Sequence, residues 1–145
     1  MLVYDAADIQ VGRLASIVAK KLLEGERVIV INVEKALFLG GDYVIEDFRN
    51  RLKIKSHVHP RNTPRHPRRP DTIFRKVVRG MLPWKKPRGR EAYKRLRVYL
   101  GVPPEYRNLK PLRFEEIDAT KRLKHKWIYV GDLLKHLGWK GIVKY

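Results

Sequence analysis

The chain has 145 residues, enough for one domain with a hydrophobic core, and 43% of them are hydrophobic, which excludes a wholly disordered chain. It contains no cysteine, which excludes disulfides and thiolate metal sites, and no apolar run approaches the roughly 20 residues that span a bilayer. The formal net charge of +18 opposes folding through self-repulsion, so it indicates an acidic partner outside the chain.

The N-terminal part predicts a strand, a helix and a second strand. LVYD, at Leu2–Asp5, is a short apolar run typical of a strand. Apolar residues then recur at spacings of three and four, as on one face of a helix: Val11, Leu14, Val18 and Leu22. Asp8 is its predicted N-cap and Gly25 its predicted end. The β-branched run Arg27–Val33 is typical of a strand buried on both faces, so this unit favours a parallel sheet.

The next segment predicts a short strand, a helix and a long loop. KALFLGGD, at Lys35–Asp42, predicts a strand that ends at two glycines. Asp42 is the predicted cap of a helix with these apolar residues: Tyr43, Val44, Phe48 and Leu52. Residues 55–70 then have no apolar periodicity and a proline at nearly every third or fourth position, which predicts an extended basic loop.

The following segment predicts a helix with a basic face. Asp71 is its predicted cap, Pro83 ends it, and an apolar stripe runs along it: Ile73, Val77 and Met81. Three bases lie on the other side: Arg75, Lys76 and Arg79. A linker around Trp84 leads to a second short helix and a strand at Arg97–Leu100.

The C-terminal part predicts one more strand and helix. Trp127–Val130 has the pattern of a strand, and Val130–Leu137 that of a short helix that ends at Gly138. We therefore expect a single domain over residues 1–145, with the basic loop at 55–70 and a C-terminal extension at 103–145.

The positive charge belongs to one segment. Residues 1–50 hold 6 Lys and Arg against 8 acids, residues 51–100 hold 17 against 2, and residues 101–145 hold 10 against 5. A solvated face is the simplest interpretation of a charge run, but here the acids that would balance such a face are missing. Nucleic acid is therefore the favoured partner, with an acidic protein or a membrane surface as alternatives. A stiff, proline-rich loop fits the crevices of a structured RNA, which makes four of its residues candidates: Arg61, Arg65, Arg68 and Arg69.

Other chemistries lack their motifs. The turn DAADIQVG between the first strand and helix has one late glycine, not the glycine-rich turn of a dinucleotide site, and no phosphate-binding GxxxxGK sequence occurs. Three histidines could suggest a metal, but their neighbours are arginines, so hydrogen bonds or stacking on RNA, or plain solvation, are favoured: His57, His59 and His66. The acids of the first fifty residues form no catalytic constellation: Asp5, Asp8, Asp42, Glu46 and Asp47. We predict no catalytic residue, metal, cofactor or small-molecule substrate.

Four stretches resemble a universal family, the thirteenth protein of the large ribosomal subunit, in its archaeal and eukaryotic branch. They are VGRLAS at Val11–Ser16, VIVINVEK at Val28–Lys35, VVRGMLPWKKPRGREAYKRLRVYLG at Val77–Gly101 and VGDLLKHLGWK at Val130–Lys140. The third is the most specific. The resemblance implies a three-layer α/β/α core with a four-stranded parallel sheet. It also implies a cytoplasmic protein of the large subunit that binds its ribosomal RNA and neighbouring proteins, supports early assembly and has no enzyme activity.

The matched motif contributes further RNA-binding candidates: Arg79, Lys85, Lys86, Arg88, Arg90, Lys94 and Arg95. Arg75 and Lys76 join them from the basic face of the helix, and Arg13 and Lys55 are additional candidates. Trp84 can stack on an unpaired base or pack inside the protein.

Two glycines of the motif, Gly80 and Gly89, are expected to allow tight turns there. The alternative function is that of an RNA-processing enzyme, or of another RNA-binding protein, on an α/β scaffold. A convergent acid–base pair in a pocket would favour the enzyme.

Overall fold

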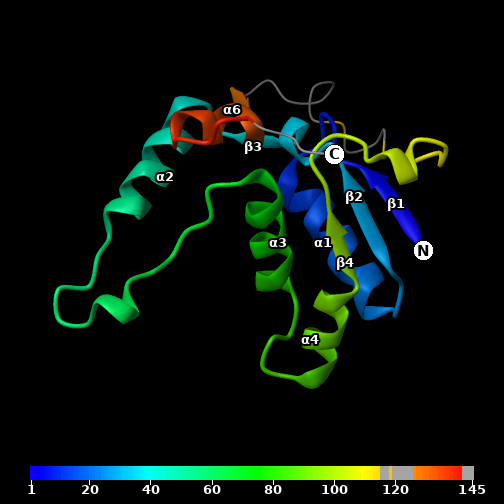
Figure 1. The fold of residues 1–145 in the computed structure, drawn as a ribbon, viewed down its shortest axis with the longest axis horizontal. Coiled ribbons are helices and arrows are strands. Elements are labelled where there is room, and N and C mark those ends of the chain that lie inside the picture. The colour runs from blue at the N-terminus through cyan, green and yellow to red at the C-terminus, as the bar shows by residue number, and fades with distance from the viewer. Residues whose placement is uncertain (115–117, 119–125, 142–145) are drawn as a thin grey trace.

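A parallel sheet forms the centre of the computed structural model, which describes residues 1–114, 118 and 126–141. β1 (Leu2–Asp5) pairs in parallel with β2 (Val28–Ile31), and α1 (Val11–Leu23) connects them. β4 (Leu96–Val98) pairs in parallel with the other edge of β2, so the order is β1-β2-β4 (Figure 1). The predicted α/β class and the N-terminal strand–helix–strand unit are confirmed.

The predicted four-stranded parallel sheet has to be corrected to three strands in the described residues. β3 (Leu37–Leu39) pairs antiparallel with β5 (Trp127–Tyr129) in a separate two-stranded sheet. Only the short 3₁₀ turn η1 (Val33–Lys35) separates β2 from β3, whereas a parallel return needs a crossover of a dozen or more residues. On the free edge of β1, Leu112 adds a single parallel bridge to Tyr4.

Three helices pack on one face of the parallel sheet. α1, α3 (Pro70–Met81) and α4 (Pro87–Lys94) contribute to one buried cluster with the strands (Figure 1). Leu14 from α1, Phe74 from α3 and Ala92 from α4 are at most 1% exposed there. This arrangement fixes the position of α3 and α4, which carry the matched basic motif.

The opposite face of the sheet is covered differently. Val3, Ile29 and Ile31 pack against Tyr99, Val102 and Tyr106. These three come from the segment after β4 and from the 3₁₀ turn η3 (Pro104–Tyr106). The helical third layer of the prediction is therefore not confirmed within the described residues.

The C-terminal strand and helix are part of the core. α6 (Val130–His136) follows β5 directly, and it buries Val130 and Leu134 in the same cluster as α1 and α3. β5 also pairs with β3. Backbone hydrogen bonds from β5 and apolar packing from α6 therefore both attach this segment to the rest of the chain. No helix within the described ranges is both long and apolar enough to cross a membrane.

α2 (Asp42–Lys53) and the loop after it lie away from the parallel sheet (Figure 1). α2 buries Ile45, and Phe48 and Leu52 are half-buried against the main cluster. Residues 54–69 then contain one short 3₁₀ turn, η2 (Pro60–Asn62), before α3 begins at Pro70. The long irregular stretch expected from the prolines is present.

Several predicted caps are wrong. α1 begins after Gln10, and Asp8 instead adopts a left-handed backbone (φ 60°) and binds residues from the C-terminal part. The N-cap of α2 is Gly41 and that of α3 is Arg69; Asp42 and Asp71 lie within the first turns instead. Carboxylates in the first turn still favour the helix, because they face its positive end.

Candidate nucleic-acid interface

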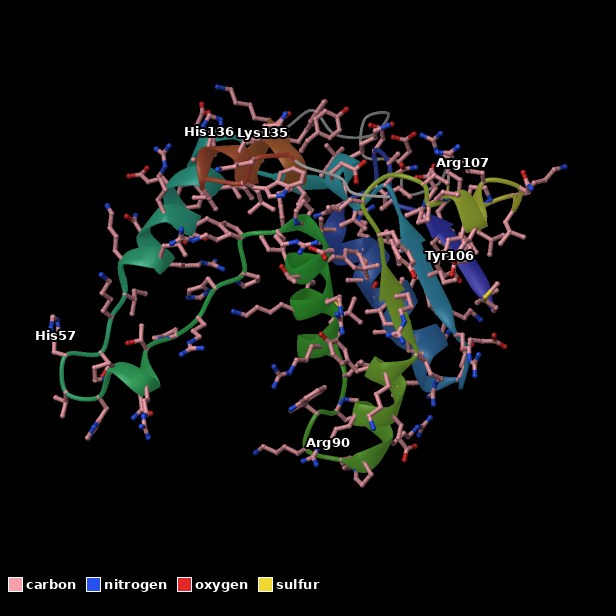
Figure 2. All side chains as sticks on the ribbon, viewed as in Figure 1. His57, Arg90, Tyr106, Arg107, Lys135 and His136 are labelled. Atoms are coloured by element: carbon pink, nitrogen blue, oxygen red, sulfur yellow. The ribbon has the colours of Figure 1, made fainter. Side chains whose placement is uncertain are left out.

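The arginines of the loop are exposed, and a hydrogen bond within the loop restrains its conformation. Arg61, Arg65 and Arg68 are exposed, and Arg69 pairs with Asp71 at 3.2 Å (Nη2 to Oδ2). Within the loop, the Ser56 N–H donates to Thr63 Oγ1 at 3.2 Å. Figure 2 shows His57 at the far end of the loop, distant from the sheet. These arginines are available to an external anion.

Lys76 attaches the loop to α3. Its ammonium donates to the Arg65 carbonyl oxygen and to His66 Nδ1, both at 3.3 Å. Burial, Lys76 and Arg51 together lower the pKa of His66, so the neutral imidazole is favoured. Lys76 is therefore a positioning residue with one donor left. His66 is a hydrogen-bond partner of α3, and its predicted contact with RNA stays a prediction.

Arginine and aromatic side chains alternate between α3 and α4. The Arg79 guanidinium lies 4.0 Å from the centre of the Trp84 ring, Trp84 packs edge-on against Tyr93 at 5.3 Å, and Arg75 lies 5.1 Å from Tyr93. We call these four residues the cation–aromatic ladder. Such contacts are worth about 0.5–2 kcal/mol each, so they restrain the two guanidinium groups. Trp84 is half-buried, with one face covered by Arg79 and its edge against Tyr93, and its predicted stacking on a base stays a prediction.

The turn between α3 and α4 depends on Gly89. A Cβ added there would lie 2.2 Å from the Pro83 carbonyl oxygen, so the backbones approach closer than any side chain permits. Arg90 also closes this turn, because its Nε donates to the Trp84 carbonyl oxygen at 3.1 Å. Gly89, the third residue of α4, thus permits the tight approach to Pro83, whereas Gly80 lies inside α3 with open space around it and permits no tight turn.

Two arginines of the matched motif stabilise α1. Arg88 donates to the Leu23 carbonyl oxygen at 3.0 Å and Arg95 to the Leu22 carbonyl oxygen at 2.8 Å. Both carbonyls belong to the last turn of α1, where the helix dipole favours positive charge. The sequence does not distinguish these arginines from their neighbours, because the contacts span 65 and 73 residues.

The remaining candidates are exposed lysines and outlying residues. Lys85, Lys86 and Lys94 are exposed and form no hydrogen bond or ion pair with the described part of the chain. Arg90 lies at the end of α4 remote from the sheet (Figure 2). Arg13 is exposed on α1 and Lys55 at the start of the loop, so they lie on other elements than the motif.

Arg51 was absent from the candidates. It lies in the last turn of α2, 5.3 Å from the Phe48 ring and paired with Asp47 at 2.6 Å (Nη2 to Oδ2). The basic run RNRLKIK, which leads directly into the loop, was the available signal.

Three carboxylates line a cavity away from the basic segment. An RNA-processing enzyme, the alternative function, would need an acid–base pair in such a cavity. A cavity of about 470 Å³ beside η1 and α6 is lined by Asp8, Glu34 and Asp132. Asp8 accepts from the Tyr129 hydroxyl at 3.0 Å, Glu34 from the Gly101 N–H at 3.0 Å, and Asp132 pairs with Lys135 at 3.1 Å. Burial and the Asp8 carboxylate raise the pKa of Tyr129. Each carboxylate thus connects two chain segments or balances a charge.

Comparison with known proteins identifies the family. The model of the family "Ribosomal protein L13" matches residues 1–105. The large ribosomal subunit protein uL13 of Methanopyrus kandleri is 49% identical over 95% of this chain and 87% of its own length. Those of Aeropyrum pernix and Methanocaldococcus jannaschii are 47% and 42% identical, over 99% and 97% of this chain and 93% and 99% of their own lengths. Because the family model matches residues 1–105 and these relatives are 42% to 49% identical over nearly the whole chain, the chain belongs to the ribosomal protein L13 family.

Proposed function

We propose that this protein is a structural constituent of the large ribosomal subunit in the cytoplasm, where it binds large-subunit ribosomal RNA and supports early assembly. Its family membership supports the proposal, because the relatives are named as proteins of the large ribosomal subunit. Neighbouring proteins of the subunit are its other partners. We further propose a single domain over residues 1–145 with an extension at 103–145, and the packing of β5 and α6 against the rest of the chain supports this.

The observation that carries the proposal is the large excess of exposed bases over acids on the loop, α3 and α4. Residues 51–100 contain 17 Lys and Arg but only two acids, and one of these, Asp71, already pairs with Arg69. RNA phosphates neutralise such a surface and release their counterions, which is the main source of affinity for a nucleic acid. The bases proposed to contact phosphate directly are Arg61, Arg65, Arg68, Arg69, Arg79, Lys85, Lys86, Arg90 and Lys94.

The other candidates act mainly by position. Lys76 holds the loop against α3, and Trp84 and Arg75 belong to the cation–aromatic ladder that restrains Arg79. Arg88 and Arg95 hold α4 and the start of β4 against the end of α1, and the exposed Arg88 has further N–H groups that can face phosphate. Side chains restrained before binding lose less entropy when RNA arrives.

The test is sedimentation of the purified protein with large subunits that lack it, across a range of salt. We expect saturable, stoichiometric cosedimentation at moderate salt and none with small subunits. Equal binding to both subunits, or none at moderate salt, would contradict the proposal. Incubation with large-subunit RNA also tests the alternative enzyme, since protein-dependent cleavage or modification of the RNA would favour it.

A further inference from the structure

A second kind of RNA contact is suggested by a cavity between α2, the end of the loop and α3. Its volume is about 390 Å³, within the range of small-molecule sites. Phe38 and Phe48 form part of its wall, with ring centres 5.7 Å apart and planes tilted by 55°. Val44 from α2 and Val77 from α3 add apolar surface on two further sides. All four side chains are only half-buried, so apolar surface remains open inside the cavity.

Polar groups around the cavity supply donors and one acceptor. Arg51 and Lys76 are cationic, and Asp47, which pairs with Arg51, supplies carboxylate oxygens. His66 Nδ1 accepts a hydrogen bond from the Lys76 ammonium. Because an ammonium can only donate, the proton of the neutral imidazole lies on Nε2. The cavity therefore combines an apolar and aromatic wall with groups that can bind both the C=O and the N–H of a planar ring.

We propose that this cavity receives one unpaired base of the ribosomal RNA, splayed out of its strand, with Arg51 and Lys76 near the adjoining phosphate. Recognition of single-stranded RNA uses this combination, in which an extruded base stacks on an aromatic or guanidinium plane and bonds through its edges. The inference rests on the proposed function and adds a site of base recognition to a surface otherwise built for phosphates.

The surroundings favour a nucleotide over a protein side chain. The loop that closes one side carries Arg65 and Arg68, and Arg51 and Lys76 line the cavity itself. A neighbouring protein would have to bring an apolar side chain into this excess of positive charge, whereas a nucleotide brings its own negative charge. Stacking of one base is worth a factor of about 5 to 150 in affinity.

The experiment fills the cavity without changing any charge. Val77→Trp fills it from α3 and Val44→Trp from α2, so a folding defect in one leaves the other, and melting curves identify it. Tyr43→Trp is the matched control, because Tyr43 precedes Val44 on α2, is 75% exposed and does not line the cavity. Each full-length protein is titrated with large-subunit ribosomal RNA, and base-specific chemical probing records which unpaired bases it protects.

We expect both filling variants to bind about 5- to 150-fold more weakly with an unchanged salt slope, and to lose protection of the same single unpaired base. Tyr43→Trp should match the wild type. Wild-type affinity and protections in both folded filling variants would overturn the inference while leaving the proposed function intact. The inference would also be overturned if both filling variants bound RNA normally but failed to bind in the presence of other subunit proteins. In that case the cavity would be occupied by a protein side chain. Absence of salt-dependent binding by the wild type would instead contradict the proposed function.

Discussion

Residues 1–50 and residues 51–100 are equal in length but use their basic side chains differently. The first fifty hold 6 Lys and Arg against 8 acids. Lys21, for example, pairs with Glu24 at 2.8 Å. Glu24 lies four residues before Val28, the fully buried first residue of β2. The second fifty hold 17 against 2. There, Arg88 and Arg95 bind carbonyls of α1, whereas Lys85, Lys86 and Lys94 project into solvent.

The difference shows that the role of a base depends on the groups within its reach. In the first region, acids outnumber bases, and Lys21 reaches the Glu24 carboxylate within one helical turn. In the second, a few carboxylates, backbone carbonyl oxygens and the faces of aromatic rings serve as acceptors, and these engage only some of the bases. The remainder, among them Lys85, Lys86 and Lys94, have no acceptor in the described part of the chain, which leaves them for the phosphates of an RNA.

Salt dependence should give the largest contrast between the two regions. If about six to ten phosphates are neutralised, affinity for large-subunit ribosomal RNA should fall by roughly a thousandfold or more between 50 and 200 mM salt. Replacing Arg65, Arg68 and Arg69 together by Ala should lower the slope of log affinity against log salt by about 2–3, since three phosphate contacts go. The measurement is a salt titration of binding.

The matched control changes the same number of charges in the first fifty residues. Lys20→Ala, Lys21→Ala and Lys35→Ala together should leave the slope nearly unchanged, because this region has no excess of bases to direct at RNA. Equal slope changes in the two triple variants would refute the division into scaffold and contact surface, without refuting RNA binding.

The turn before α4 should be the most sensitive backbone position of the basic region. Gly89→Ala places a Cβ 2.2 Å from the Pro83 carbonyl oxygen, so the backbone must move, and we expect a loss of about 1–3 kcal/mol in the free energy of unfolding. Urea denaturation measures it. Gly80→Ala in α3 has open space and should stabilise by up to about 1 kcal/mol through helix propensity. A neutral Gly89→Ala would show that α4 can separate from Pro83 at no cost.

Adjacent bases in the basic region should separate into the two roles. Arg95→Met removes the bond to the Leu22 carbonyl oxygen while keeping most of the side chain's apolar volume, so the free energy of unfolding should fall by about 1–2 kcal/mol. Lys94→Met should change stability by less than about 0.5 kcal/mol. It should instead lower the salt slope by about 0.9, the value of one phosphate contact.

Denaturant titrations and salt titrations of both variants make this comparison. A stability loss with Lys94→Met that equals the loss with Arg95→Met would mean that the hydrogen bond at 2.8 Å contributes little, and that general charge density acts instead.

Local pattern was sufficient to predict most elements, because each carries its own signal. The apolar stripe of α1, the β-branched run of β2 and the proline-rich loop were predicted at nearly the observed bounds. The pairing of β3 was not, since a strand of three residues has no pattern that selects a partner, and its partner β5 lies about ninety residues away. The cap at Asp8 failed because Tyr129, distant in sequence, competes for its carboxylate.

The same limit applies to the candidate interface. Charge counts located the basic segment, but they assigned one role to all of its bases. Only long-range contacts separate Arg95, bound to α1, from its neighbour Lys94, and only packing places Arg79 against Trp84. Arg51 was overlooked because its importance comes from the cavity that it lines with Phe48, and a cavity between three elements has no sequence pattern.

The smallest contrast concerns Trp84, which we expect to act on RNA through Arg79. Trp84→Leu keeps every charge but removes the ring that lies 4.0 Å from the Arg79 guanidinium, so Arg79 gains freedom that RNA binding must remove again. Affinity for large-subunit ribosomal RNA should fall about two- to fivefold at fixed salt, the value of one exposed cation–π contact, with an unchanged salt slope. Arg79→Met, in contrast, should lower the slope by about 0.9 because a phosphate contact is lost. Trp84→Phe should restore most of the affinity, since a phenyl ring can still face the guanidinium. If Trp84→Leu changed the slope as much as Arg79→Met, the indole would be holding more than one base in place, and Arg90, which donates to the Trp84 carbonyl oxygen at 3.1 Å, would be the next residue to test.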